Sequence, residues 1–175
     1  MFPAILKRIA VSISAAGILF QCTPALHAAD RGPSTPEERQ QAVDYTKDFL
    51  ANPVGPKGVH EREWVLEWAI AVPDVHVTVC LLLEKQPKGN KQDANTIFAA
   101  TVLAQTAFSI QHPDAQRDSH EAFLAGIQGA LQVYEELLAA RPKDRQPYLD
   151  DLLQRRAAGT LPQWVADRAG KACSK

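Results

Sequence analysis

The sequence has almost no net charge and few cysteines. Its 175 residues include 19 basic and 20 acidic side chains and three cysteines. This balance excludes a nucleic-acid-binding protein that works by bulk electrostatics, because no basic excess exists to displace phosphate counterions. The hydrophobic fraction of 46% and the charged fraction of 22% are those of an ordinary globular protein. The length suits one domain, with or without a short appendage.

The signature motifs of the common enzyme classes are also missing. The sequence contains no Gly-x-Ser-x-Gly, no Gly-x-Gly-x-x-Gly and no P-loop. It contains no His-Glu-x-x-His, Cys-x-x-Cys or Cys-x-x-Cys-His spacing either. These patterns identify many hydrolases, nucleotide-binding enzymes, metal sites and haem proteins. We therefore expect no cofactor, no metal and no catalytic residue, and the sequence favours a protein that is not an enzyme.

No apolar run is long enough to span a bilayer, but a shorter one follows the N-terminus. Lys7 and Arg8 precede an apolar and small-residue run over residues 9–20, and Ala28-Ala29 lie further on. This order is typical of a secretory signal peptide. A membrane-spanning helix needs roughly 20 apolar residues. We predict a signal peptide over residues 1–29, a single helical domain over 30–175 and no retained membrane span.

Export would place the mature protein in the periplasm or outside the cell. Two alternatives stay open. The apolar run could be retained as an anchor, or Cys22 could carry a lipid. Against the second, Gln21 stands where a lipoprotein signal has a small residue.

Cleavage would leave two cysteines, Cys80 and Cys173. Disulfides form in oxidising compartments, and an even number of cysteines in an exported chain indicates a bridge. We predict a Cys80–Cys173 disulfide; two unpaired thiols are the alternative. The closed loop would be about 93 residues long, for which chain entropy gives about 4–5 kcal/mol of stabilisation.

Recurring capping and stop signals predict an all-α fold. Thr35-Pro36-Glu37-Glu38 combines a capping box with proline at the first helical position, and Gly159 suits a C-cap. We expect about seven short helices in a compact orthogonal or solenoid-like bundle. Their approximate ranges are 36–51, 60–72, 74–85, 93–111, 119–140, 146–158 and a last helix from about 161.

The segment 74–85 is ambiguous in sequence. Val75, Val77 and Val79 are β-branched and favour a strand. However, no other segment offers a second strand, and a lone buried strand would leave its main-chain groups unpaired. We therefore expect a buried helix, in which His76 would be a hydrogen-bonded core residue.

Two neighbouring helices carry faces of small residues. Ala100, Ala104 and Ala107 share a face of the fourth helix, and Gly126 and Gly129 share one on the next. A glycine inside a helix costs about 1 kcal/mol relative to alanine. We expect close approach of the two backbones to compensate.

Three stretches together resemble a family of small secreted bacterial proteins of unknown function. They are residues 72–77 (VPDVHV), 111–114 (QHPD) and 124–131 (LAGIQGAL). The resemblance extends from about Trp64 to Cys173. It implies an exported, all-helical domain with no assigned activity, and it transfers no catalytic residue.

Residues 130–144 (ALQVYEELLAARPKD) also resemble the second helix of a tetratricopeptide unit. Residues 99–113 end in a similar way 29 positions earlier, whereas the usual period is about 34. This likeness implies helical hairpins rather than a regular repeat.

One connection is rich in groups that bind ions or protons. We name it as a candidate binding site made of His112, Asp114, Asp118, His120 and Glu121. Zinc needs three or four such ligands. The alternative is that these residues belong to a loop and a helix cap, with the carboxylates stabilising the helix N-terminus.

These observations favour an exported binding or interaction module with a protein partner in the cell envelope. The first alternative is a carrier that holds a small apolar ligand among its helices. The second is an enzyme whose site has no recognisable motif. An exposed apolar patch would favour the binding module, and an internal apolar cavity would favour the carrier. A cleft of titratable groups would favour the enzyme.

Overall fold

The computed structural model describes residues 31–80, 82–83, 91–115 and 119–172. These residues form six α-helices: α1 (Pro36–Ala51), α2 (Pro56–Ala71), α3 (Lys91–Gln111), α4 (His120–Ala140), α5 (Pro147–Ala157) and α6 (Leu161–Ala172). The expected all-α class is confirmed, and the described residues contain no strand. None of the described helices is long and apolar enough to cross a membrane.

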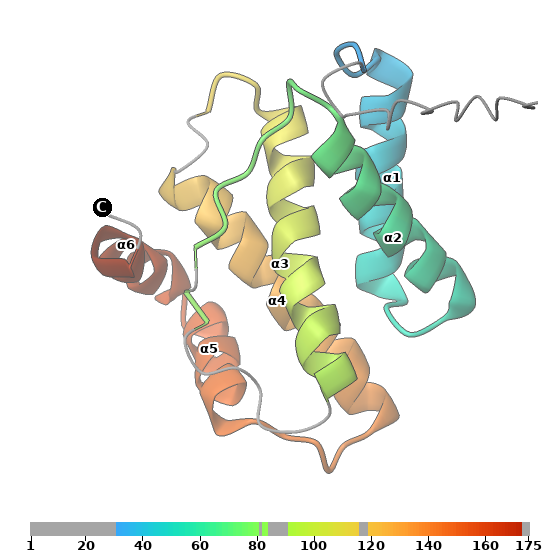
Figure 1. Cartoon of the computed structure of the whole chain (residues 1–175). Coiled ribbons are helices and arrows are strands. Elements are labelled where there is room, and N and C mark those ends of the chain that lie inside the picture. Colours follow the sequence, from blue (N-terminus) through green and yellow to red (C-terminus); the bar gives the residue numbers. More distant parts are fainter. Residues whose placement is uncertain (1–30, 81, 84–90, 116–118, 173–175) are drawn as a thin grey trace, which may run out of the picture.

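The helices pack around a central pair. α3 and α4 make the most extensive contact; α1 and α2 pack on one side of this pair, and α5 and α6 contact α4 (Figure 1). The largest fully buried side chains come from all six helices and are Phe49, Glu61, Val65, Ile97, Leu103, Phe123, Ile127, Leu131, Tyr134, Leu149, Leu152 and Leu161. α2 adds Val65 and Trp68 to the same core.

Several helix ends follow their sequence signals. The Thr35 side chain accepts from the Glu38 N–H while Glu38 accepts from the Thr35 N–H, which completes the expected capping box. Gly159 has a φ of 71° after α5, the left-handed conformation that favours glycine. Ser119 caps α4 by accepting from the Ala122 N–H. Glu121 is therefore the second helical residue and does not complete a capping box.

The small-residue faces of α3 and α4 are in direct contact, as expected. A Cβ built on Gly129 would lie 2.5 Å from the Ala104 Cβ and 3.0 Å from the Ala100 carbonyl oxygen. Neither neighbour can rotate away, because one is a first side-chain carbon and the other is backbone. Glycine at position 129 therefore sets how closely the two central helices approach.

Polar contacts fix the C-terminal part of α4. Arg141, which follows α4, donates to both carboxylate oxygens of Asp93 in the first turn of α3, each at 2.6 Å. Tyr134 is 1% exposed; its hydroxyl donates to Asp150 and accepts from the Gln146 N–H. The second pair of bonds attaches α5 to α4.

The largest departure from expectation is the segment 74–85: its described residues, 74–80 and 82–83, form no helix, so the predicted helix is wrong there. Residues 72–80 are neither helix nor strand, and they run as an extended chain from the end of α2 across α3 (Figure 1). Pro73 disfavours helical backbone at Val72, whose ψ is 135°. The β-branched side chains that follow lose rotamer freedom in a helix. The segment is only partly buried, so water can solvate its backbone and the cost that favoured a helix does not arise.

A second difference lies at the start of α2. The helix expected from about residue 60 begins at Pro56, four residues earlier. Proline is favoured in the first helical turn because the N–H it lacks would have no partner there. Gly58 is buried against the preceding turn, which makes a small residue suitable at that point.

The Gly129 contact generates a prediction. Gly129→Ala should lower the free energy of unfolding by about 1–3 kcal/mol, because the added methyl must push α3 from α4. Helix propensity alone would give a gain of about 1 kcal/mol. Urea unfolding measures the difference, with exposed Gln128→Ala as control. A more stable Gly129→Ala variant would contradict the described contact.

Candidate functional site

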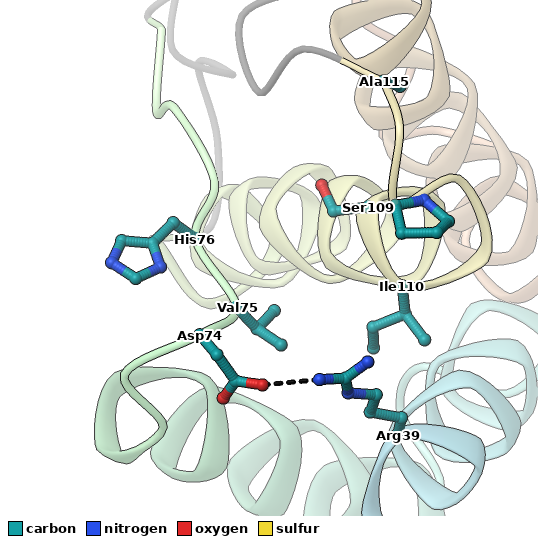
Figure 2. A pocket seen from close by; sticks show the side chains of 8 residues that line it. Arg39, Asp74, Val75, His76, Ser109, Ile110 and Ala115 are labelled. Atoms are coloured by element: carbon teal, nitrogen blue, oxygen red, sulfur yellow. Dashed lines mark hydrogen bonds and ion pairs between the residues drawn. The ribbon is translucent and has the colours of Figure 1, made fainter. Parts of the chain in front are cut away.

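A small pocket of about 260 Å³ lies where the extended segment leaves α2. Its walls come from the start of α1, the beginning of the extended segment and the end of α3. Figure 2 shows Asp74 facing Arg39, with Val75 and Ile110 beside the pair and His76 standing apart from it. Ser109, Pro113 and Ala115 complete the lining.

The carboxylate of Asp74 is the best-bonded polar group of this pocket. It accepts from the Ser34 N–H and the Ser34 hydroxyl, both at 2.8 Å, and from the Arg39 guanidinium at 2.6 Å. Arg39 also donates to the Ser34 hydroxyl at 2.7 Å. These bonds join the segment before α1, α1 itself and the start of the extended segment.

The same bonds keep Asp74 ionised. Its partial burial alone would raise the pKa, but the bonds from Ser34 and Arg39 outweigh that effect and lower the pKa of Asp74 to about 2. Among the described lining residues, the only Asp, Glu, Lys or Arg side chains are those of Arg39 and Asp74, and they form an ion pair with each other. No hydrogen bond joins Ser109 to His76 within the described residues. The bonds around Asp74 therefore join three parts of the fold.

The predicted binding residues of the α3–α4 connection lie at the surface. His112, Asp114, His120 and Glu121 are exposed, and Asp118 lies outside the described residues. The ring of His112 contacts that of Phe108, with centroids 4.4 Å apart. Within the described residues, no group of three or more His, Cys, Asp or Glu side chains could hold a metal ion. Ligand binding at this connection stays a prediction.

Two further expectations concern the extended segment. His76 is exposed, so the prediction of a core histidine is wrong, because that prediction rested on a helix that does not form. Cys80 is partly buried near the end of the segment. Cys173 lies outside the described residues, so the disulfide stays a prediction.

The sequence did not reveal an apolar groove bordered by α2 and the extended segment. This α2–α3 groove has a volume of about 350 Å³. Its described lining comes from three elements: Leu66, Ala69 and Ile70 of α2, Val102 and Thr106 of α3, and Val72, Val75, His76, Val77 and Val79 after α2. A neighbouring hollow of about 490 Å³ shares Leu66 and Val102 with it and extends to Phe98.

Three large apolar side chains around these hollows are exposed. The exposed fractions are 79% for Ile70, 51% for Val79 and 42% for Phe98. Ile70 could have been noticed in the sequence, because it falls outside the inward stripe that contains Trp64, Val65 and Trp68. The groove itself could not, because it depends on the path of residues 72–80.

The backbone of the extended segment has a further property. Within the described part of the chain, the main-chain N–H and C=O groups of residues 75–79 make no hydrogen bond. Further along, the Leu82 carbonyl accepts from the Tyr148 hydroxyl of α5 at 3.1 Å. Asp74 at one end and Leu82 at the other therefore hold the segment, while its middle has unpaired main-chain groups.

Comparisons with protein-family models, with curated proteins and with solved structures find no match for this chain. The conclusions about function therefore depend on the residues and geometry described above.

The Asp74 contacts generate a pH prediction. Because the folded-state pKa is lowered, the stabilisation is complete above about pH 4 and disappears as the pH falls to about 2. Asp74→Asn should lower the free energy of unfolding by about 1–2 kcal/mol at pH 7, allowing for solvent screening, and by much less at pH 2.5. Urea unfolding at both pH values measures this difference. Asp114→Asn, at an exposed position, should have no effect at either pH. An equal effect of Asp74→Asn at both would contradict the assignment.

Proposed function

We propose that this chain is an exported helical binding module of the cell envelope that takes a protein partner on the apolar surface of α2 and α3. The observation that carries the proposal is the exposure of Ile70, Val79 and Phe98 around two adjoining hollows. Single exposed apolar residues are common, whereas a contiguous apolar patch marks an interaction site. Because Leu66 and Val102 line both hollows, we treat the two as one continuous surface.

The composition of this surface suits a protein partner. Among the described residues, the α2–α3 groove is lined by no Asp, Glu, Lys or Arg, and the neighbouring hollow includes the Arg62–Glu63 ion pair in its lining. An apolar centre with a polar rim is the usual arrangement of a protein interface. Lys and Glu, which are depleted at the centres of protein interfaces, do not occur in the described lining of the groove.

Neither alternative has comparable support. A carrier would need an enclosed apolar cavity, and the small-residue faces that suggested one pack directly on each other at Gly129 and Ala104. An enzyme would need convergent titratable groups in a cleft. In the described pocket at Asp74, the two charged groups instead pair with each other.

We retain export and the disulfide as parts of this proposal. The residue pattern of positions 1–29 supports cleavage and passage to an oxidising compartment. The bond between Tyr148 and Leu82 draws the end of the extended segment towards α5. α5 contacts α6, whose last residue, Ala172, directly precedes Cys173. This arrangement supports a Cys80–Cys173 bridge.

Site-specific photo-crosslinking in the envelope of the host tests the binding surface. We expect a photoreactive residue in place of Ile70 or Phe98 to give a discrete protein adduct, because both side chains would lie in the interface. The control is Val54, which is 54% exposed in the turn between α1 and α2, away from the groove. Adducts of equal yield from all three positions, or from none, would contradict a protein-binding role for this surface.

The disulfide generates a separate prediction. Replacing Cys80 and Cys173 together with alanine should lower the thermal midpoint under oxidising conditions, by an amount that corresponds to at most about 4–5 kcal/mol. Addition of a reductant should lower the midpoint of the natural chain towards that of the variant. Intact mass measured without reduction provides a second readout, because formation of the bridge removes two hydrogens from the chain. Equal midpoints for variant and natural chain under oxidising conditions would refute the bridge.

A further inference from the structure

We infer that the partner contributes an extended, β-branched peptide segment that lies in the α2–α3 groove and pairs as a β-strand with residues 75–79. This inference rests on the proposed function and names the kind of partner that the groove accepts. Strand addition to an unpaired edge is a common mode of peptide recognition, in which main-chain bonds give affinity and side-chain pockets give specificity.

The first support is a conflict between local sequence and fold. Four of the five residues at 75–79 are β-branched, namely Val75, Val77, Thr78 and Val79. Such a run favours a strand, yet the described residues contain no other strand with which it could pair. A segment that prefers the strand conformation and has no partner strand in its own chain is suited to pair with a strand from another molecule.

The second support is the free hydrogen-bonding capacity of the backbone. The N–H and C=O groups of residues 75–79 make no bond within the described part of the chain, and these residues are partly or fully exposed. An exposed row of unpaired main-chain groups is a template for pairing with another chain. An incoming strand can satisfy these groups, whereas a helix or a lipid chain cannot, because neither offers a matching row of free donors and acceptors.

The third support is the shape of the groove. One wall is the extended segment itself, the other is the apolar side of α2 with Leu66 and Ile70, and Val102 of α3 lies between them. A strand paired with the segment would therefore contact α3 with alternate side chains. Five residues of strand span about 17 Å.

The lining determines which side chains the occupant presents. The residues that the strand would cover are apolar or Thr106, so side chains directed at α3 should be valine, isoleucine or threonine rather than charged. A second copy of this chain fits less well. Its own residues 75–79 already line a groove over α3, and they would have to leave that helix to enter another groove.

A designed peptide pair tests the inference on the full chain. The probe is an acetylated peptide of alternating threonine and valine flanked by lysines. Its matched control has the same side chains but N-methyl groups on all interior amides, which removes every main-chain donor. We expect the probe to bind with a Kd of about 10⁻⁴ M, because main-chain bonds and a small apolar area favour binding while ordering the peptide opposes it. The methylated peptide should bind at least tenfold more weakly.

Hydrogen exchange identifies the paired edge. Successive N–H groups of a strand point to opposite edges, so bound probe should slow exchange at alternate residues, either 75, 77 and 79 or 76 and 78. The double variant Val77→Pro with Thr78→Pro removes a donor from each edge and should lose probe binding while keeping the helical circular dichroism. The exchange Val77→Thr with Thr78→Val keeps both donors and should bind the probe within a few-fold of the natural chain.

The outcomes separate this inference from the proposed function. Equal binding of both peptides would overturn strand pairing and leave an apolar binding surface. No binding of either peptide at 2 mM would also overturn it, and crosslinking from Ile70 would then decide whether the surface binds protein. Concentration-dependent dimers with slowed exchange at residues 75–79 in the absence of probe would replace the partner peptide with a second copy.

Discussion

The hydrogen bonds on the Asp74 carboxylate determine where the chain runs after α2. Ser34 and Arg39 bind this carboxylate from the segment before α1 and from α1 itself. Pro73, which directly precedes Asp74, disfavours helical backbone at Val72 and so ends α2. The bonds on Asp74 then fix the direction in which the chain leaves the helix. Val75 and His76, which follow Asp74 directly, line both the pocket at Asp74 and the α2–α3 groove, so both depend on this attachment.

The helical core provides a rigid support for that segment. α3 and α4 are in close contact at Gly129, and one guanidinium nitrogen of Arg141, just after α4, donates to both carboxylate oxygens of Asp93 at the start of α3. α3 can then expose Val102 on its outer side while its inner side stays buried. The bonds at Asp74 and Leu82 hold the two ends of the extended segment. Its middle therefore keeps its position, although the main-chain groups of residues 75–79 make no hydrogen bond within the described residues.

The helices were predictable because their signals are local. Thr35 with Glu38, Gly159 and the small faces around Gly129 each depend on neighbours in sequence or on one packing contact. The conformation of the segment 74–85 was not predictable from local signals. The expected helix assumed that the segment is buried, and its burial depends on how α2 and α3 are placed. His76 was assigned to the core by the same assumption. The groove could not be predicted for the same reason, although the β-branched run and the exposed Ile70 were its visible traces.

The functional proposal depends on one physical property of the free protein: within the described part of the chain, the main-chain groups of residues 75–79 have no protein partner. Residue-resolved hydrogen exchange of the isolated chain measures this most directly. We expect the amides of residues 75–79 to exchange at close to the rate of an unstructured peptide, while amides in the middle of α3 and α4 exchange orders of magnitude more slowly. Strong protection at residues 75–79 in the isolated chain would show that these groups are already paired, and would contradict the proposed strand docking.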